Sequence, residues 1–158
     1  MIVVSDTTPL HYLILIDEVE LLPSVLGEIV IPSIVFDELR HEHTPNKIKE
    51  YLRFPPEWLS VRKATGIIDV RLEGIDQGER EAILLAEELA ADALLIDDLA
   101  GRKFAESRGL KVIGTLGVLE LADEKGLTNF LRAMDRIKST GFFISSSLER
   151  DLMDKHLR

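Results

Sequence analysis

The sequence of 158 residues contains no cysteine and few aromatic residues: one tryptophan, two tyrosines and six phenylalanines. The absence of cysteine excludes disulfides and thiolate zinc sites, and it fits a reducing cytoplasm. No apolar run approaches the length of a membrane span, and no basic leader precedes the short apolar run at the start. We therefore expect a cytoplasmic protein with no signal peptide, no transmembrane helix and no membrane partner.

Basic residues are also in deficit, with 19 lysines and arginines against 28 acidic residues and a net charge of −9. This charge argues against nucleic-acid binding by bulk electrostatics. It does not exclude an enzyme with an acidic cleft, because bound divalent cations would neutralise the cleft. The basic residues gather around 40–53, 102–103 and 132–138, and we interpret most of them as solvated surface.

Short β-branched runs alternate with helical patterns, which predicts one α/β domain over residues 1–158 with a parallel sheet. Strands are expected at 2–5, 28–32, 93–97 and 110–115, with a weaker candidate at 58–64. Helices are expected at 9–19, 33–41, 75–91 and 101–109, with Ser33 as the cap of the second. One or two helical turns are expected at 47–52, and C-terminal helices from about 117, at 117–125, 127–138 and 145–156. The pattern is weak between residues 42 and 74.

Carboxylates follow two of the expected strands. Asp6 ends the first strand, and the adjacent Asp97 and Asp98 end the strand before residue 99. Ligands of open parallel sheets bind at the carboxyl ends of the strands, and neighbouring strands would bring these groups together. Each carboxylate also has a structural alternative, because Asp6 or one of the paired aspartates can cap the helix that follows it.

Two glutamates occupy the expected inward faces of helices. Glu38 lies four residues after Ile34, and Glu79 lies three and four residues before apolar positions of its own helix. A carboxylate on an inward face needs a hydrogen-bonding partner or a metal. The alternatives are that Glu38 extends to solvent or pairs with Arg40, that the neighbouring Asp37 is the acid of this helix, and that Glu79 forms a capping box with Asp76.

Four acidic sites around one edge of a sheet favour metal-dependent hydrolysis. Mg²⁺ and Mn²⁺ prefer carboxylate oxygens, and one or two such ions can activate water and orient a phosphodiester. Thr7 or Thr8 can supply a hydroxyl group that orients this water. If the acids share one site, the pKa of at least one is raised in the metal-free protein. The sequence has no serine elbow, no glycine-rich phosphate loop and no zincin spacing among its histidines.

Five segments resemble, in order, the motifs of PIN-domain proteins: VVSDTTPL, IVIPSIVFDEL, IDQGEREAILLA, LLIDDLAGRKFA and GLKVIGTLGVL. The similarity covers most of the chain and is closest to a prokaryotic subfamily related to VapC-type toxins of toxin–antitoxin pairs. The resemblance implies a three-layer α/β/α sandwich with a central parallel sheet. It also implies a Mg²⁺- or Mn²⁺-dependent endoribonuclease that acts on RNA, commonly as a homodimer, and, for a toxin, an antitoxin protein as partner.

The resemblance also assigns residues. The family's catalytic and metal-binding acids fall on Asp6, Glu38, Glu79 and Asp98, with Asp97 as a further metal ligand and Glu81 as a less suitable register for the third acid. Arg102 is expected to contact a substrate phosphate or the dimer partner, with a surface ion pair as the alternative. Ile96 departs from many toxins, which carry threonine or serine there.

Two other readings remain open. A receiver-type signalling domain is also a parallel α/β fold with acids at strand ends, but the first strand here ends in a single aspartate and the strand at 110–115 ends without a lysine. The second is a PIN fold that binds RNA or a partner protein without cleaving.

Overall fold

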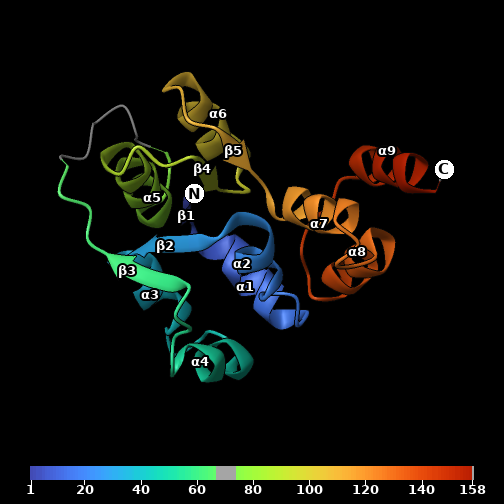
Figure 1. Ribbon diagram of the computed structural model, residues 1–158, viewed down its shortest axis with the longest axis horizontal. Coiled ribbons are helices and arrows are strands. Elements are labelled where there is room, and N and C mark those ends of the chain that lie inside the picture. The colour runs from blue at the N-terminus through green and yellow to red at the C-terminus, as the bar shows by residue number, and fades with distance from the viewer. Residues whose placement is uncertain (67–73, 158) are drawn as a thin grey trace.

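A five-stranded parallel sheet organises the computed structural model, which describes residues 1–66 and 74–157. The strands are β1 (Ile2–Ser5), β2 (Glu28–Pro32), β3 (Leu59–Arg62), β4 (Ala93–Leu95) and β5 (Val112–Ile113). Their order is β3-β2-β1-β4-β5, and each neighbouring pair is parallel (Figure 1). The chain thus builds outward from β1 to one side and from β4 to the other, so the topology reverses between β1 and β4.

Helices cover both faces of this sheet (Figure 1). They are α1 (Thr7–Leu15), α2 (Leu21–Leu26), α3 (Ser33–Leu39), α4 (Asn46–Leu52), α5 (Gln77–Glu88), α6 (Leu99–Ser107), α7 (Thr115–Glu124), α8 (Phe130–Ser139) and α9 (Ser146–His156). Over residues 1–66 and 74–157, none of the helices is both long and apolar enough to cross a bilayer.

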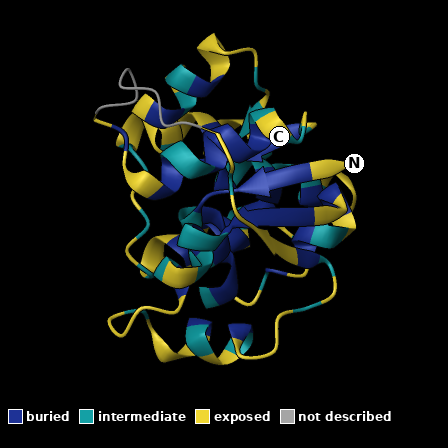
Figure 2. Cartoon of the chain, turned by 90° about the vertical axis from the view of Figure 1, so that its left-hand side faces the viewer, coloured by how far each residue is buried: buried dark blue, intermediate teal, exposed yellow. Residues whose placement is uncertain are grey.

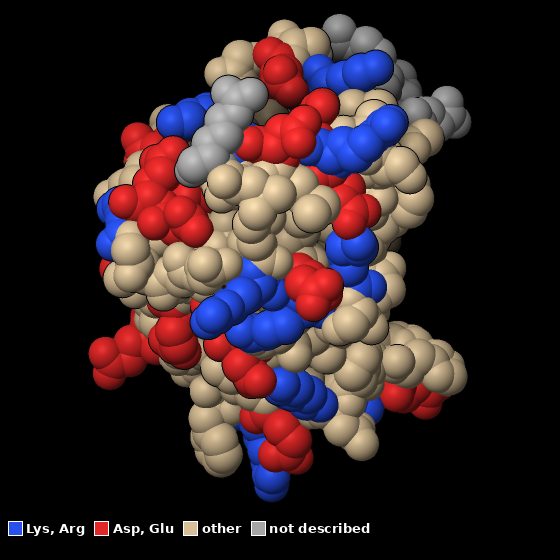
Figure 3. Space-filling model, turned by 90° about the vertical axis from the view of Figure 1, so that its right-hand side faces the viewer, with Lys and Arg blue, Asp and Glu red and all other residues tan. Residues whose placement is uncertain are grey.

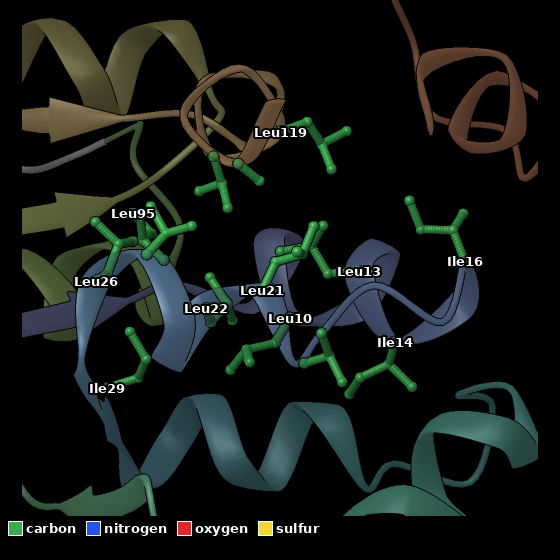
Figure 4. Close-up of a cluster of buried hydrophobic side chains, with 14 of the residues drawn as sticks. Leu10, Leu13, Ile14, Ile16, Leu21, Leu22, Leu26, Ile29, Leu95 and Leu119 are labelled. Atoms are coloured by element: carbon green, nitrogen blue, oxygen red, sulfur yellow. The ribbon is translucent and has the colours of Figure 1, made fainter. Parts of the chain in front are cut away.

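Alternating residues of the central strands build two separate cores, which is why β1, β2 and β4 are largely apolar. Val3 and Leu95 point to the larger core with α1, α2, α7 and α8, whereas Val4 and Leu94 point to the smaller core under α5 and α6. Figure 2 shows the buried strands between helices with exposed outer faces. Figure 4 shows how leucines and isoleucines of α1 and α2 meet Leu119 of α7 in the larger core. The predicted three-layer α/β/α sandwich is confirmed.

The first helical region is divided differently from the prediction. A single helix over 9–19 is wrong: α1 begins at Thr7 and ends at Leu15, and a separate α2 follows. Asp17 adopts a positive φ of 59°, a conformation that breaks a right-handed helix. Pro23 lies in the first turn of α2, where a missing N–H costs little, and Gly27, with φ of 81°, follows its end.

Other boundaries differ by a few residues. Ser33 is the first residue of α3, and Pro32 rather than Ser33 holds the cap position. The strands β4 and β5 are shorter than the predicted 93–97 and 110–115, because the chain turns away to begin α6 and α7. Helix α5 is likewise shorter than 75–91, α6 begins at Leu99, α7 begins at Thr115 and α8 begins at Phe130.

Candidate metal centre

Acidic side chains meet where β1 and β4 end, at the reversal of the strand order. The backbone N–H of Asp6 donates to the carbonyl of Leu95 at 2.9 Å, so the residues that follow both strands start side by side. This position is the crevice in which open α/β sheets bind ligands. The expectation that parallel neighbours bring Asp6 and the Asp97–Asp98 pair together is therefore met.

Asp6 is almost fully buried, with 5% of its surface exposed. Burial raises the pKa of Asp6 to about 7, and the charges of Asp76, Glu38 and Asp97 add to the rise, although the N–H of Thr7 opposes it. Asp6 stands at the cap position of α1, but its side chain makes no capping hydrogen bond. Capping does not explain this carboxylate.

Glu79 is the second buried acid, with 7% of its surface exposed. The predicted capping box is half present: Asp76 caps α5 by accepting the Glu79 N–H at 2.8 Å. Within the described part of the chain, Oε2 of Glu79 has no hydrogen-bond partner. The pKa of Glu79 is raised to about 9, and burial is the largest cause. A hydrogen bond to Asp76 and the negative charges of Asp76, Asp98 and Asp6 raise it further. At least two acids thus meet the expectation of a raised pKa.

Asp76 is a member of this centre that the sequence did not single out. The sequence pattern indicates it only as a capping partner of Glu79, and it does cap α5. Its charge also raises the pKa of both buried acids. A capping aspartate and a ligand aspartate look alike in a sequence, and the signal that separates them is the tertiary neighbourhood.

Glu38 reaches the centre from α3, where it is half-buried. The hydroxyl of Thr7 donates to Oε2 of Glu38 at 2.5 Å, which ties α1 to α3. The carboxylate also lies against Gly78, where a Cβ would be 2.9 Å from either oxygen. The alternative pairing with Arg40 is wrong, because Arg40 binds Asp37 at 3.3 Å instead.

Asp98 and Asp97 follow β4 and have different surroundings. Asp98 is exposed and caps α6 by accepting the Gly101 N–H at 3.1 Å. Asp97 accepts the N–H of Thr115 at 2.8 Å with one oxygen and the Thr115 hydroxyl at 2.5 Å with the other. The pKa of Asp97 is raised overall, because the effect of burial outweighs the hydrogen bonds from Thr115 and the charge of Arg102, which both lower it. Asp97 therefore joins β4 to α7, and its role as a metal ligand stays a prediction.

Glycines allow these carboxylates to approach. A Cβ at Gly101 would lie 2.7 Å from Oε2 of Glu79 and 2.7 Å from Cδ1 of Ile96. The buried glutamate thus rests on the backbone of α6, one turn from Asp98. Only glycine leaves this space without moving a neighbour.

The donor set fits a hard divalent cation. Its members are carboxylates, which Mg²⁺ and Mn²⁺ prefer, and Oε2 of Glu79 is buried without a hydrogen-bond partner among residues 1–66 and 74–157. In residues 1–66 and 74–157, no three acidic or histidine side chains converge tightly enough to count as a formed metal site. Glu38, Glu79 and Asp98 therefore stay predicted ligands.

Comparison with known proteins agrees with this geometry. A family model described as a PIN domain, DUF3368, matches residues 2–157. The chain belongs to the PIN domain family. A solved structure of a PilT N-terminus domain protein from the hyperthermophilic archaeon Sulfolobus solfataricus P2 has the same fold, with a TM-score of 0.57 and 22% identity over 78% of this chain and 92% of that one. No curated protein matches the chain.

PIN domains are commonly nucleases and typically bind divalent metals. In this PIN domain, a groove of about 1040 Å³ runs from the acidic centre and includes Thr8, Glu79, Asp98 and Arg102 in its lining. Thr7, in contrast, is committed to Glu38. Of the two threonines considered for orienting water, Thr8 is the one that lines the groove.

The basic segment at 40–53 offers few free cations. Arg40 pairs with Asp37, Lys47 with Asp17 and Arg53 with Glu50. On the side of the molecule where α8 and α9 lie, acidic and basic side chains are interspersed (Figure 3). The ion pairs of the 40–53 segment and the mixed charge on the side of α8 and α9 therefore fit the interpretation of both basic segments as solvated surface.

Proposed function

We propose that this PIN domain is a metal-dependent endoribonuclease that hydrolyses RNA phosphodiester bonds at the acidic centre. The observation that carries the proposal is the buried Oε2 of Glu79, which has no hydrogen-bond partner in the described part of the chain and lies among other carboxylates. A buried carboxyl oxygen without a hydrogen-bond partner is costly, and the raised pKa of Glu79 shows that its ionised form is disfavoured while no cation is bound. A divalent cation bound to this oxygen would remove that cost. The reaction class comes from the PIN domain family, whose members are commonly nucleases.

Asp6, Glu38, Glu79 and Asp98 are the proposed ligands of Mg²⁺ or Mn²⁺. When bound, the cation would activate water for attack on phosphorus and stabilise the charge that develops on the phosphodiester oxygens. Asp97 holds α7 in place through Thr115, and Thr7 holds Glu38. Asp76 keeps the start of α5, and with it Glu79, at the edge of the sheet.

The test is cleavage of a mixed RNA pool by the purified protein with Mn²⁺, with Mg²⁺ and with a chelator. The double variant Asp6→Asn, Asp98→Asn is compared with Asp135→Asn, which changes an exposed carboxylate on α8. We expect cleavage to require metal, to be lost in the double variant and to persist in the control. Cleavage by the double variant would refute the assigned site.

Calorimetric titration with Mn²⁺ separates the proposal from its alternative. Metal binding that needs Asp6 and Asp98, without cleavage of any RNA in the pool, would favour a PIN fold that binds RNA or a partner protein. A toxin role, an antitoxin partner and a homodimer remain predictions from the resemblance. The toxin role is tested by induced expression in cells. It predicts growth arrest with the wild type and normal growth when the double variant is expressed instead.

A further inference from the structure

The loop between α8 and α9 presents an unusual pair of phenylalanines. Phe142 is half-buried and packs edge-on against Tyr12 of α1, with ring centroids 5.0 Å apart. Phe143 is 85% exposed, although it follows directly. Phe142 therefore anchors the loop to the domain, and the adjacent Phe143 projects into solvent from this anchored position.

Phe143 lines the same groove as the acidic centre. The lining runs from Glu79 and Asp98 to Phe142 and Phe143, so one continuous groove of about 1040 Å³ joins the acidic centre to the exposed ring. A longer ligand that enters the acidic centre would thus continue past this ring.

Two cations also line the groove. Lys111 is exposed, and among the described residues its ammonium group forms no hydrogen bond or salt bridge. Arg102 is half-buried beside Asp97 and lowers the pKa of that carboxyl. The chain has a net charge of −9. Two cations beside an exposed aromatic ring therefore distinguish this groove from the acidic remainder of the molecule.

We propose that Phe143 is a stacking platform for a nucleobase of single-stranded RNA, with Lys111 and Arg102 contacting the phosphates between this base and the cleavage site. The inference rests on the proposed RNA cleavage and adds the residues that hold the substrate. Single-stranded nucleic acids bind through the combination of aromatic faces and cations that the groove offers. A duplex would not fit this scheme, because its bases are already stacked on each other.

The groove lining favours RNA over a protein partner. Its exposed apolar residues, Leu99, Phe143 and Leu148, come from three separate segments, and they share the lining with charged side chains of both signs. A protein interface core is depleted of charge. Phosphates suit the two cations, and the exposed ring suits a base.

The experiment measures binding of fluorescent single-stranded RNA carrying 2-aminopurine at successive positions, in chelator so that no cleavage occurs. We expect Phe143→Ala to weaken binding roughly tenfold and to abolish quenching of the base that stacks. Phe143→Trp should keep both, and Phe143→Leu should lose the quenching. Lys111→Gln should reduce affinity and lower the salt dependence by about one phosphate contact.

Phe54→Ala is the matched control, because Phe54 is 83% exposed but does not line the groove. Equal affinity and quenching for wild type and Phe143→Ala would overturn the inference and leave the nuclease proposal intact. A change of oligomeric state in Phe143→Ala without a change in RNA binding would also overturn it, in favour of a protein interface. Absence of RNA binding and cleavage by the wild type would refute both proposals.

Discussion

Asp6→Asn should stabilise the metal-free protein at neutral pH, although it removes a residue from the proposed active site. The pKa of Asp6 is raised from 3.8 to about 7, and burial is the main cause. Below pH 3.8 the carboxyl is protonated in both the folded and the unfolded chain. Between pH 3.8 and 7 only the folded chain keeps the proton, so the unfolding free energy that Asp6 contributes falls as the pH rises.

The size of the effect follows from the same values. A rise of the pKa from 3.8 to about 7 corresponds to on the order of 4 kcal/mol of unfolding free energy lost above pH 7, at about 1.4 kcal/mol per pKa unit. Asparagine carries no charge and keeps a hydrogen-bonding oxygen, so the variant should escape most of this loss. The side chain is only 5% exposed, and solvent screening therefore does little to reduce the effect.

The assay is urea unfolding in chelator from pH 4.5 to 8, followed by circular dichroism and by fluorescence of Trp58, the single tryptophan. The quantity of interest is the unfolding free energy of Asp6→Asn minus that of the wild type, which should grow with pH and level off above 7. Asp135→Asn should give a flat difference. A flat or falling difference for Asp6→Asn would refute the idea that this buried carboxylate is uncompensated without metal.

Three further predictions concern the same centre. Gly101→Ala places a methyl group against Glu79 and should cost about 1–3 kcal/mol of unfolding free energy and abolish Mn²⁺ binding, as urea titration and calorimetry can check. Thr115→Val removes a hydroxyl that donates to Asp97 and should cost about 1–3 kcal/mol; normal stability in urea would contradict this. Mn²⁺ at a hundredfold excess over Kd should stabilise the wild type by about 2.7 kcal/mol but not Asp98→Asn, and equal thermal shifts would remove Asp98 from the ligand set.

Much of the fold could be predicted because its central strands are buried on both faces. Such strands appear as short β-branched runs, and the runs at 2–5 and 28–32 match β1 and β2. Helix α2 lies beyond the predicted helix at 9–19, and its six residues are too few to show a helical period in the sequence. The signal that divides them was Pro23, which fits a first helical turn, followed by Gly27.

The site could be predicted only in part, for a different reason. Asp6, Glu38, Glu79 and Asp98 come from separate elements, and their order along the chain resembles that of the family. The sequence does not contain the distances that decide their roles. Both oxygens of Asp97 are used by Thr115, and this contact spans 18 positions of the chain without a pattern that announces it.

Capping and catalysis are not competing explanations of these acids. Asp76 caps α5, Asp98 caps α6, and Asp97 accepts the N–H of the first residue of α7. Each of these helix N-termini has a partial positive charge that offsets the repulsion between the carboxylates. Helix starts therefore make it possible to gather the acids in one place before any cation binds.

Capping alone, however, does not account for the charge. Asparagine and serine cap helices as well as aspartate does, without adding repulsion at a buried edge of the sheet. Asp6 makes no capping bond, and Oε2 of Glu79 has no partner in the described structure, yet both are acids. A fold that needed only helix caps would be more stable with neutral residues at these positions. Ionisable acids at these positions make physical sense if a bound cation draws out their charge, and a divalent cation is the ligand that such a set of oxygens suits.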